Sequence, residues 1–216
     1  MVIGQESRRL LQGILFKTGD FTYQVPRLDS STHAIATVDY AHHEIHGGSS
    51  FTTYYTRTTD STAGHRSALY LLTPSDKEIH LIASFSASTS ATFSMCEGVT
   101  IDVNEGTNTV VIYNRDRNSS KTSSVSNNAT VPAKGFVTSF TEAEIAAANF
   151  SAGTILRTEP LQVGTGPKPA GGSGRGSQEY ILKKSTKYVF RITNVAASAN
   201  VHHILLDWYE HTKRSS

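Results

Sequence analysis

The chain has 216 residues, of which 18% are charged, and a formal net charge of +2. This length suits one large domain or a domain with an arm, and the balanced charge gives no argument for binding nucleic acid. A run of about 20 apolar residues is absent, so no membrane-spanning helix is predicted. A single cysteine, Cys96, excludes an intramolecular disulfide.

Residues 1–32 are predicted to form an N-terminal arm, because they lack the clear alternation of a strand. Four apolar side chains in this arm would share one face of a short helix and anchor it on a neighbouring subunit, on a shell protein or on the chain's own sandwich: Leu10, Leu11, Ile14 and Phe16. The start does not follow the pattern of a secretory signal, so we expect assembly in a cytoplasm.

Residues 33–216 are predicted to form one all-β domain, a jelly-roll-like antiparallel β-sandwich. Short runs in which apolar and polar residues alternate are separated by turn-forming residues, as strands are. The predicted strands are Ala34–Tyr40, Phe51–Arg57, Ser67–Thr73, Glu78–Ser86, Ala91–Glu97, Thr109–Asn114, Thr154–Glu159, Glu179–Lys184, Thr186–Thr193 and Val201–Glu210.

The last two of these strands alternate most regularly. Because successive side chains of a strand point to opposite faces, we expect one face of each to lie in the core. Those faces carry Tyr188, Phe190 and Ile192, and then Ile204, Leu206 and Trp208.

One short helix and two polar loops complete the prediction. Thr141 and Glu144 form a capping box before an alanine-rich run that ends at Ala148, which predicts a helix of about two turns. Residues 114–128 are rich in serine and asparagine, and residues 164–176 in glycine and proline. Both are predicted to be loops, and the second lacks the Gly-Lys-Ser/Thr of a phosphate loop.

The run His42-His-Glu-Ile-His46 is the main candidate for metal chemistry. On a strand, His42, Glu44 and His46 would share one face, and a histidine of a neighbouring strand would complete a tetrahedral site; the choices are His65, His80, His202 and His203. The alternatives are imidazoles that hydrogen-bond to strand ends and tyrosines, or a subunit interface that responds to histidine protonation. We assign no metal ligand and no cofactor on this pattern.

We also assign no catalytic residue. The sequence has no Gly-x-Ser-x-Gly nucleophile elbow, and its few carboxylates lie mostly near turns rather than as the pair that glycoside hydrolysis needs. A non-enzymatic protein is therefore expected. A set of aromatic residues either fills the core or lines a sugar-binding face: Tyr23, Tyr40, Tyr54, Tyr55, Tyr70, Tyr113 and Trp208.

Several short motifs follow one another in a recognisable order. They are Tyr40-Ala-His-His-Glu-Ile-His-Gly-Gly-Ser-Ser-Phe51, Asn114-Arg-Asp-Arg-Asn-Ser-Ser120, Gly171-Gly-Ser-Gly-Arg175, Glu179-Tyr-Ile-Leu-Lys183, Thr186-Lys-Tyr-Val-Phe-Arg-Ile-Thr193 and Leu206-Asp-Trp-Tyr-Glu-His211. The ordered set resembles a widespread group of small virion proteins of tailed bacteriophages. The resemblance covers residues 38–211, and this chain departs from it at Gly47-Gly48, where an acidic residue or serine is commoner.

The resemblance implies a β-sandwich protein on the capsid exterior, a head decoration or cement protein that forms a dimer or trimer and binds the major capsid protein. It implies no nucleic-acid or membrane partner. Arg115 and Arg117 are candidate contact residues, because arginine makes paired bonds to carboxylates. The alternative is a carbohydrate-binding module of a tail or head fibre, which would use the aromatic residues.

Overall fold

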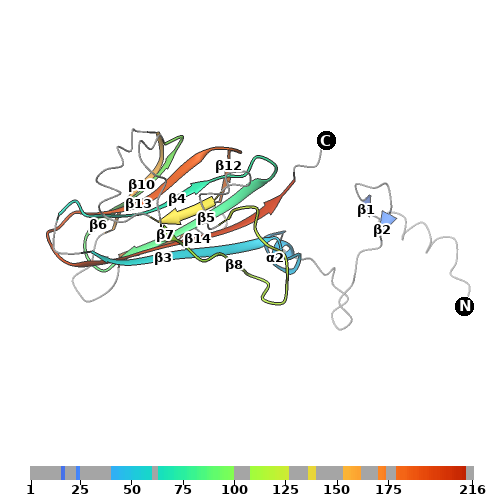
Figure 1. Cartoon of the computed structure of the whole chain (residues 1–216), viewed down its shortest axis with the longest axis horizontal. Helices are drawn as coiled ribbons and strands as arrows, with labels where there is room; N and C mark the ends of the chain where they lie inside the picture. The colour runs from blue at the N-terminus through green and yellow to red at the C-terminus, as the bar shows by residue number, and fades with distance from the viewer. Residues whose placement is uncertain are drawn as a thin grey trace, which may run out of the picture. The chain divides into compact units, whose positions relative to one another are not determined.

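The structure is a computed structural model that describes residues 42–59, 63–99, 110–126, 153–161 and 179–212, and the backbone of 16–17, 23–24, 40–41, 108–109, 136–139 and 170–173 (Figure 1). The chain divides into two compact units, residues 1–43 and 44–216. In the first, β1 (Phe16–Lys17) pairs with β2 (Tyr23–Gln24), so the helix expected at Phe16 is wrong there. Leu10, Leu11, Ile14 and the helix predicted at 141–148 lie outside the described residues.

Helix α2 (Tyr40–His46) precedes the strands of the second unit. These are β3 (Ser50–Thr59), β4 (Arg66–Leu72), β5 (Glu78–Ala87), β6 (Ala91–Glu97), β7 (Asn108–Thr109), β8 (Tyr113–Asn114), β9 (Phe136–Ser139), β10 (Thr154–Leu161), β11 (Ala170–Ser173), β12 (Tyr180–Leu182), β13 (Lys187–Asn194) and β14 (Asn200–His211).

These strands form two antiparallel sheets. One, the β13 sheet, has the order β10-β6-β13-β4-β9-β7, and the other, the β14 sheet, has the order β11-β5-β14-β3-β8, with β12 also paired to β5. The prediction of an all-β sandwich is confirmed at this level. Within the described residues, no helix combines the length and apolar character that crossing a bilayer requires.

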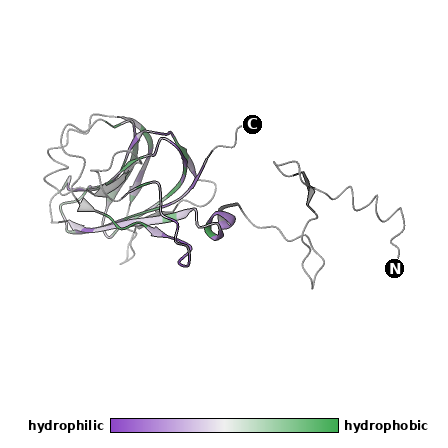
Figure 2. Cartoon of the chain, turned by 45° about the vertical axis from the view of Figure 1, so that its right-hand side comes forward, coloured by the Kyte–Doolittle hydropathy of each residue, from purple (hydrophilic) through white to green (hydrophobic). Residues whose placement is uncertain are grey.

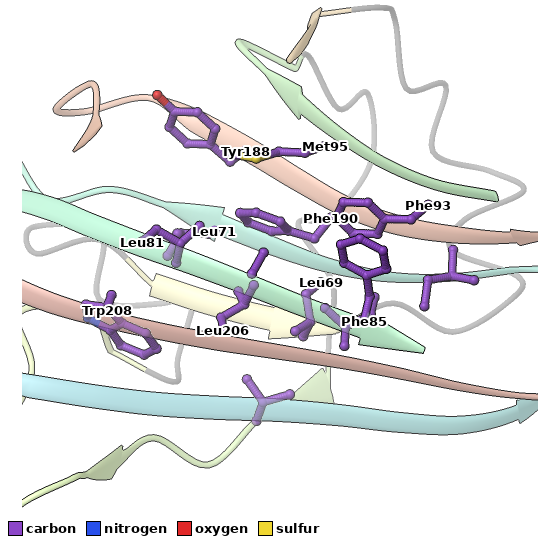
Figure 3. Packing of buried hydrophobic residues seen from close by; sticks show 14 of the residues in the cluster. Leu69, Leu71, Leu81, Phe85, Phe93, Met95, Tyr188, Phe190, Leu206 and Trp208 are labelled. Atoms are coloured by element: carbon purple, nitrogen blue, oxygen red, sulfur yellow. The ribbon is translucent and has the colours of Figure 1, made fainter. Parts of the chain in front are cut away.

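The core lies between the two sheets and follows the predicted alternation. Both predicted apolar faces, on β13 and on β14, are buried in one cluster, and Figure 3 labels Tyr188 and Phe190 of the first and Leu206 and Trp208 of the second. Across the layers, the Phe85 ring of β5 stacks on the Phe93 ring of β6, with centroids 3.7 Å apart. Apolar side chains thus alternate inward on β5, β6, β13 and β14, and burying these faces against one another gives a sandwich.

The outer faces of the two sheets differ. On the β13 sheet a second buried cluster contains Ala68, Tyr70 and Val189. On the β14 sheet most outward side chains are half-buried or exposed, with Ser50 and Tyr209 buried, and Tyr54 and Val201 are among the exposed large apolar residues. The outer face of the β14 sheet is therefore the open face of the described sandwich.

Two segments differ from the prediction. The single strand expected at Thr109–Asn114 is wrong: β7 pairs with β9 in the β13 sheet, whereas β8 pairs with β3 in the β14 sheet. The run passes from one sheet to the other, with Val110 buried and Val111 exposed. Part of the expected flexible loop at 164–176 is strand β11, which pairs with β5. The hydrogen bonds of a sheet join backbone amides and carbonyls, so the glycine-rich sequence of β11 can form them without large side chains.

The remaining predicted strands lie within a few residues of the observed ones. The exception is Ala34–Tyr40, where residues 34–39 lie outside the described residues and Tyr40 begins α2.

Two adjacent leucines of β14 test the assignment of its faces. Leu206 is fully buried in the core, and Leu205 lies half-buried on the outer face. We expect Leu206→Ala to lower the free energy of unfolding by about 3 kcal/mol, because it leaves a cavity, and Leu205→Ala to lower it by less than about 1 kcal/mol. Urea unfolding measures both; equal losses would contradict the assigned register.

Candidate functional site

Three of the sequence motifs meet at one end of the β14 sheet. The Asn114 amide donates from Nδ2 to the Gly48 and Lys121 carbonyls, both at 3.0 Å, and its Oδ1 accepts from the Asp116 amide at 2.9 Å. The Arg115 amide donates to the Ser50 carbonyl at 2.9 Å. Motif residues more than 60 positions apart are thus joined by the Asn114 side chain.

The closing motif belongs to the same junction. The buried Glu210 carboxylate accepts hydrogen bonds from the Ser123 hydroxyl, the Ser124 amide at 2.9 Å and Trp208 Nε1 at 3.1 Å. The Lys77 ammonium lies 3.7 Å away. A buried carboxylate needs such partners. The motif residues around Asn114 and Glu210 therefore hold the loop after β8 against the last strand.

The two arginines chosen from the sequence lie in this loop. The side chains of Arg115 and Arg117 are exposed, and the Arg117 guanidinium lies 5.5 Å from the centroid of the Tyr113 ring. This cation–π arrangement orients Arg117 beside the open face of the β14 sheet. Their role as contact residues stays a prediction.

The histidine-rich run lies on helix α2, not on a strand as expected, and Figure 2 shows this helix mainly in the hydrophilic colours. Apolar and polar residues do not alternate regularly in this run, so it lacks the pattern of a strand. Gly48 follows with a left-handed φ of 68°, a conformation that commonly ends a helix. On a helix, His42 and His46 share a face and Glu44 lies roughly opposite. The strand-based metal site of His42, Glu44 and His46 is therefore wrong.

One set of side chains has the composition of a catalytic triad. His202 Nδ1 lies 2.9 Å from Ser67 Oγ, and its Nε2 lies 2.7 Å from Asn194 Oδ1. Ser67 and His202 are fully buried, and Asn194 is also bonded to Thr59 and Asn200. A substrate cannot reach this serine, so the network serves to satisfy buried polar groups at one end of the core.

Burial and the charge of Arg57 lower the pKa of His202 to about 4. The imidazole is therefore neutral at pH 7. The geometry agrees, because a neutral ring has one donor nitrogen for Asn194 Oδ1 and one acceptor nitrogen for the Ser67 hydroxyl.

An aromatic patch lies on the open face, formed by Tyr54, Tyr113, His203 and Arg117. The rings of Tyr54 and Tyr113 are nearly parallel, with an interplanar angle of 9° and centroids 6.4 Å apart. His203 lies 6.1 Å from Tyr54 and hydrogen-bonds through Nδ1 to Thr56 at 2.8 Å. This patch is a flat, partly exposed aromatic surface.

The other aromatic residues that the sequence offered are placed differently. Tyr70 and Trp208 are buried, and Tyr55 packs partly buried against the core. The side chains of Tyr23 and Tyr40 lie outside the described residues. Arg117 and His203 could not be predicted from the sequence as neighbours of the tyrosines, because only the pairing of β3 with β8 and β14 brings them together.

Comparison with known proteins gave no match among family models, curated proteins or solved structures.

Two glycines with left-handed backbones test the junction. A Cβ on Gly48 (φ 68°) would lie 2.3 Å from Ser119 Oγ, whereas a Cβ on Gly64 (φ 82°) meets nothing within 4 Å. Both alanine variants carry a backbone strain of about 1 to 2 kcal/mol, and Gly48→Ala adds a steric clash. Chemical unfolding should show Gly48→Ala as the less stable of the two; the reverse order would contradict the close approach of Ser119.

The buried histidine predicts acid sensitivity. Because the folded-state pKa of His202 lies near 4 and the unfolded value near 6.5, its contribution is complete above about pH 6.5 and lost as the pH falls toward 4. Between pH 7 and pH 4 the free energy of unfolding should fall by about 2 to 3 kcal/mol more than in His202→Gln. Identical pH profiles for the two proteins would show that His202 is not buried neutral.

Proposed function

We propose that this chain is a non-enzymatic structural protein of a tailed-bacteriophage virion, a head decoration or cement protein that binds the major capsid protein on the outside of the shell. The ordered motifs of the sequence support this proposal. So does the role of those motifs around Asn114 and Glu210, whose hydrogen bonds hold the framework together.

The observation that carries the proposal is the open face of the β14 sheet. The solvated face of an antiparallel sheet is normally polar. Here Tyr54 is 51% exposed and Ile181 is 64% exposed, and the half-buried Leu205 lies beside Tyr54 across the β14–β3 pair. Exposed apolar residues thus lie at two places on this face, Tyr54 with Leu205 on β3 and β14 and Ile181 on β12, and we propose that a protein partner covers both.

We also propose that the sandwich is a jelly roll. Strand β14 lies between β3 and β5, and β13 lies between β4 and β6, while β3, β4, β5 and β6 alternate between the sheets. Strands β10 and β11 then extend the two sheets next to β6 and β5. This order supports two interleaved Greek keys, an architecture that recurs in viral capsid and lectin domains.

A cement protein works through several rigidly linked contacts. Each contact is weak alone, but linking them raises the effective concentration of the second and third contacts. The sandwich supplies the rigid body, and self-association into a dimer or trimer repeats the open face around a junction of the shell. The bound oligomer then resists separation of the capsid subunits beneath it.

The aromatic patch favours one second candidate, a carbohydrate-binding module of a phage fibre. Nearly parallel tyrosine rings such as Tyr54 and Tyr113 offer apolar faces on which sugar rings stack. The two functions use the same face and differ in what occupies it.

Binding to empty shells of the major capsid protein from the same phage tests the proposal. In co-sedimentation we expect saturable binding at micromolar concentration. Ile181→Ser should weaken it about tenfold or more, a loss of about 1.4 kcal/mol. The matched control is Ile155→Ser, because Ile155 is 60% exposed but belongs to β10 of the other sheet.

The outcomes separate the candidates. Absence of capsid binding, or equal weakening by Ile181→Ser and Ile155→Ser, would refute the proposed use of the open face. Retardation on a polysaccharide affinity gel that Tyr54→Ala abolishes would establish the carbohydrate-binding alternative instead.

A further inference from the structure

A cluster of histidine and carboxylate side chains lies on the outer face of the β14 sheet, apart from the aromatic patch. It consists of Glu78, His80 and His211, with Glu179 and Tyr209 around them. Strands β5 and β14 pair so that Tyr209 faces His80 and His211 faces Glu78. The alternation of the two strands turns all four toward the same side, and Glu179 joins them from the residue before β12.

Two hydrogen bonds fix the orientation of His80. Its Nδ1 lies 2.5 Å from Glu179 Oε1 and 3.0 Å from the Tyr209 hydroxyl, which itself donates to Glu179 Oε1 at 2.7 Å. Nδ1 therefore carries the ring hydrogen and donates a hydrogen bond to the Glu179 carboxylate. Nε2 is left with its lone pair, and it is buried with no hydrogen bond to any described residue.

Histidines that bind metals are held in this way. Their second ring nitrogen donates to a carboxylate, which fixes the tautomer and makes the ligating nitrogen more basic. The bond from His80 to Glu179 supplies that arrangement, and the Tyr209 ring stacks on His80 with centroids 4.6 Å apart.

Two further ligand atoms lie close to His80. His211 Nε2 is 3.5 Å from Glu78 Oε2, and one ligand atom from each of Glu78, His80 and His211 lies within 4.8 Å of the others. Ligands of a tetrahedral zinc ion are about 3.4 Å apart, given bonds of about 2.0 to 2.1 Å. Small side-chain rotations therefore bring the three atoms to metal-binding distance.

We propose that Glu78, His80 and His211 form a binding site for a divalent transition-metal ion, with Zn²⁺ the best match. Two imidazoles and one carboxylate suit zinc and its neighbours better than calcium or magnesium, which prefer oxygen ligands. The side chains are 18%, 11% and 27% exposed, respectively. The site is thus open on one side, where a water molecule completes the coordination.

Metal titration of the full-length protein, stripped with a chelator, tests this site. Isothermal titration with Zn²⁺ should show one ion bound per chain, and Co²⁺ should give the visible absorption bands of a tetrahedral site. His80→Ala and His211→Ala should each lower the affinity at least about tenfold, and Glu179→Gln, which removes only the orienting bond, by about ten- to hundredfold.

The conservative variant Glu78→Gln removes a ligand charge with little change in shape, and circular dichroism confirms that each variant is folded. His203→Ala is the matched control, because His203 lies on the same face of β14 but pairs with Thr56. The proposal is overturned if Zn²⁺ and Co²⁺ do not bind, if folded Glu78→Gln binds as tightly as the parent chain, or if binding is lost in His42→Ala/His46→Ala instead.

Discussion

The register of β14 between β3 and β5 is the constraint on which the rest of the structure depends. Its even-numbered residues from Ile204 to Trp208 fill the core, and its odd-numbered residues from His203 to His211 form the middle of the open face. A slip of one residue would exchange these two sets. Burying Leu206 and Trp208 therefore also determines that Leu205, Tyr209 and His211 face outward, so the core's packing positions the groups that we propose bind a partner and a metal.

Alternation along single strands was enough to predict the class of fold. The runs that became β5, β6, β13 and β14 have one mainly apolar face, and their burial confirms the expectation. The run from Thr109 to Asn114 failed because its four central residues, 110–113, are all apolar or aromatic, so its pattern does not show that the backbone leaves one sheet and joins the other. Helix α2 failed for a related reason: a short polar run with three histidines has little preference of its own, and the Gly48 turn decides its end.

The candidate sites were harder to predict, because they depend on which strands are neighbours. His80 and His203 were recognised as available histidines, yet their real partners come from residues more than 90 positions away, such as Glu179 for His80 and Thr56 for His203. The sequence carries no signal for such pairs until the strand order is known. The sequence motifs show the reverse. They can be read directly from the sequence, but the hydrogen bonds that Asn114 makes to Gly48 and that Glu210 accepts are known only from the structure. Their residues satisfy buried polar groups, so a motif here marks a constraint of the fold as much as a point of contact.

The position of β14 in its sheet has a kinetic consequence. Ser50 at the start of β3 donates its hydroxyl hydrogen bond to the Trp208 carbonyl, 158 residues later, and β5 likewise borders β14 rather than β3. Neither strand has its main partner until β14 (Asn200–His211) is available, so this layer closes only after pairing across most of the described chain. Such long-range pairing slows folding, and the waiting strands expose unpaired edges and apolar surface in the meantime. This layer should therefore fold more slowly than a sheet built from strands adjacent in sequence, although the finished sandwich is held together by a continuous core.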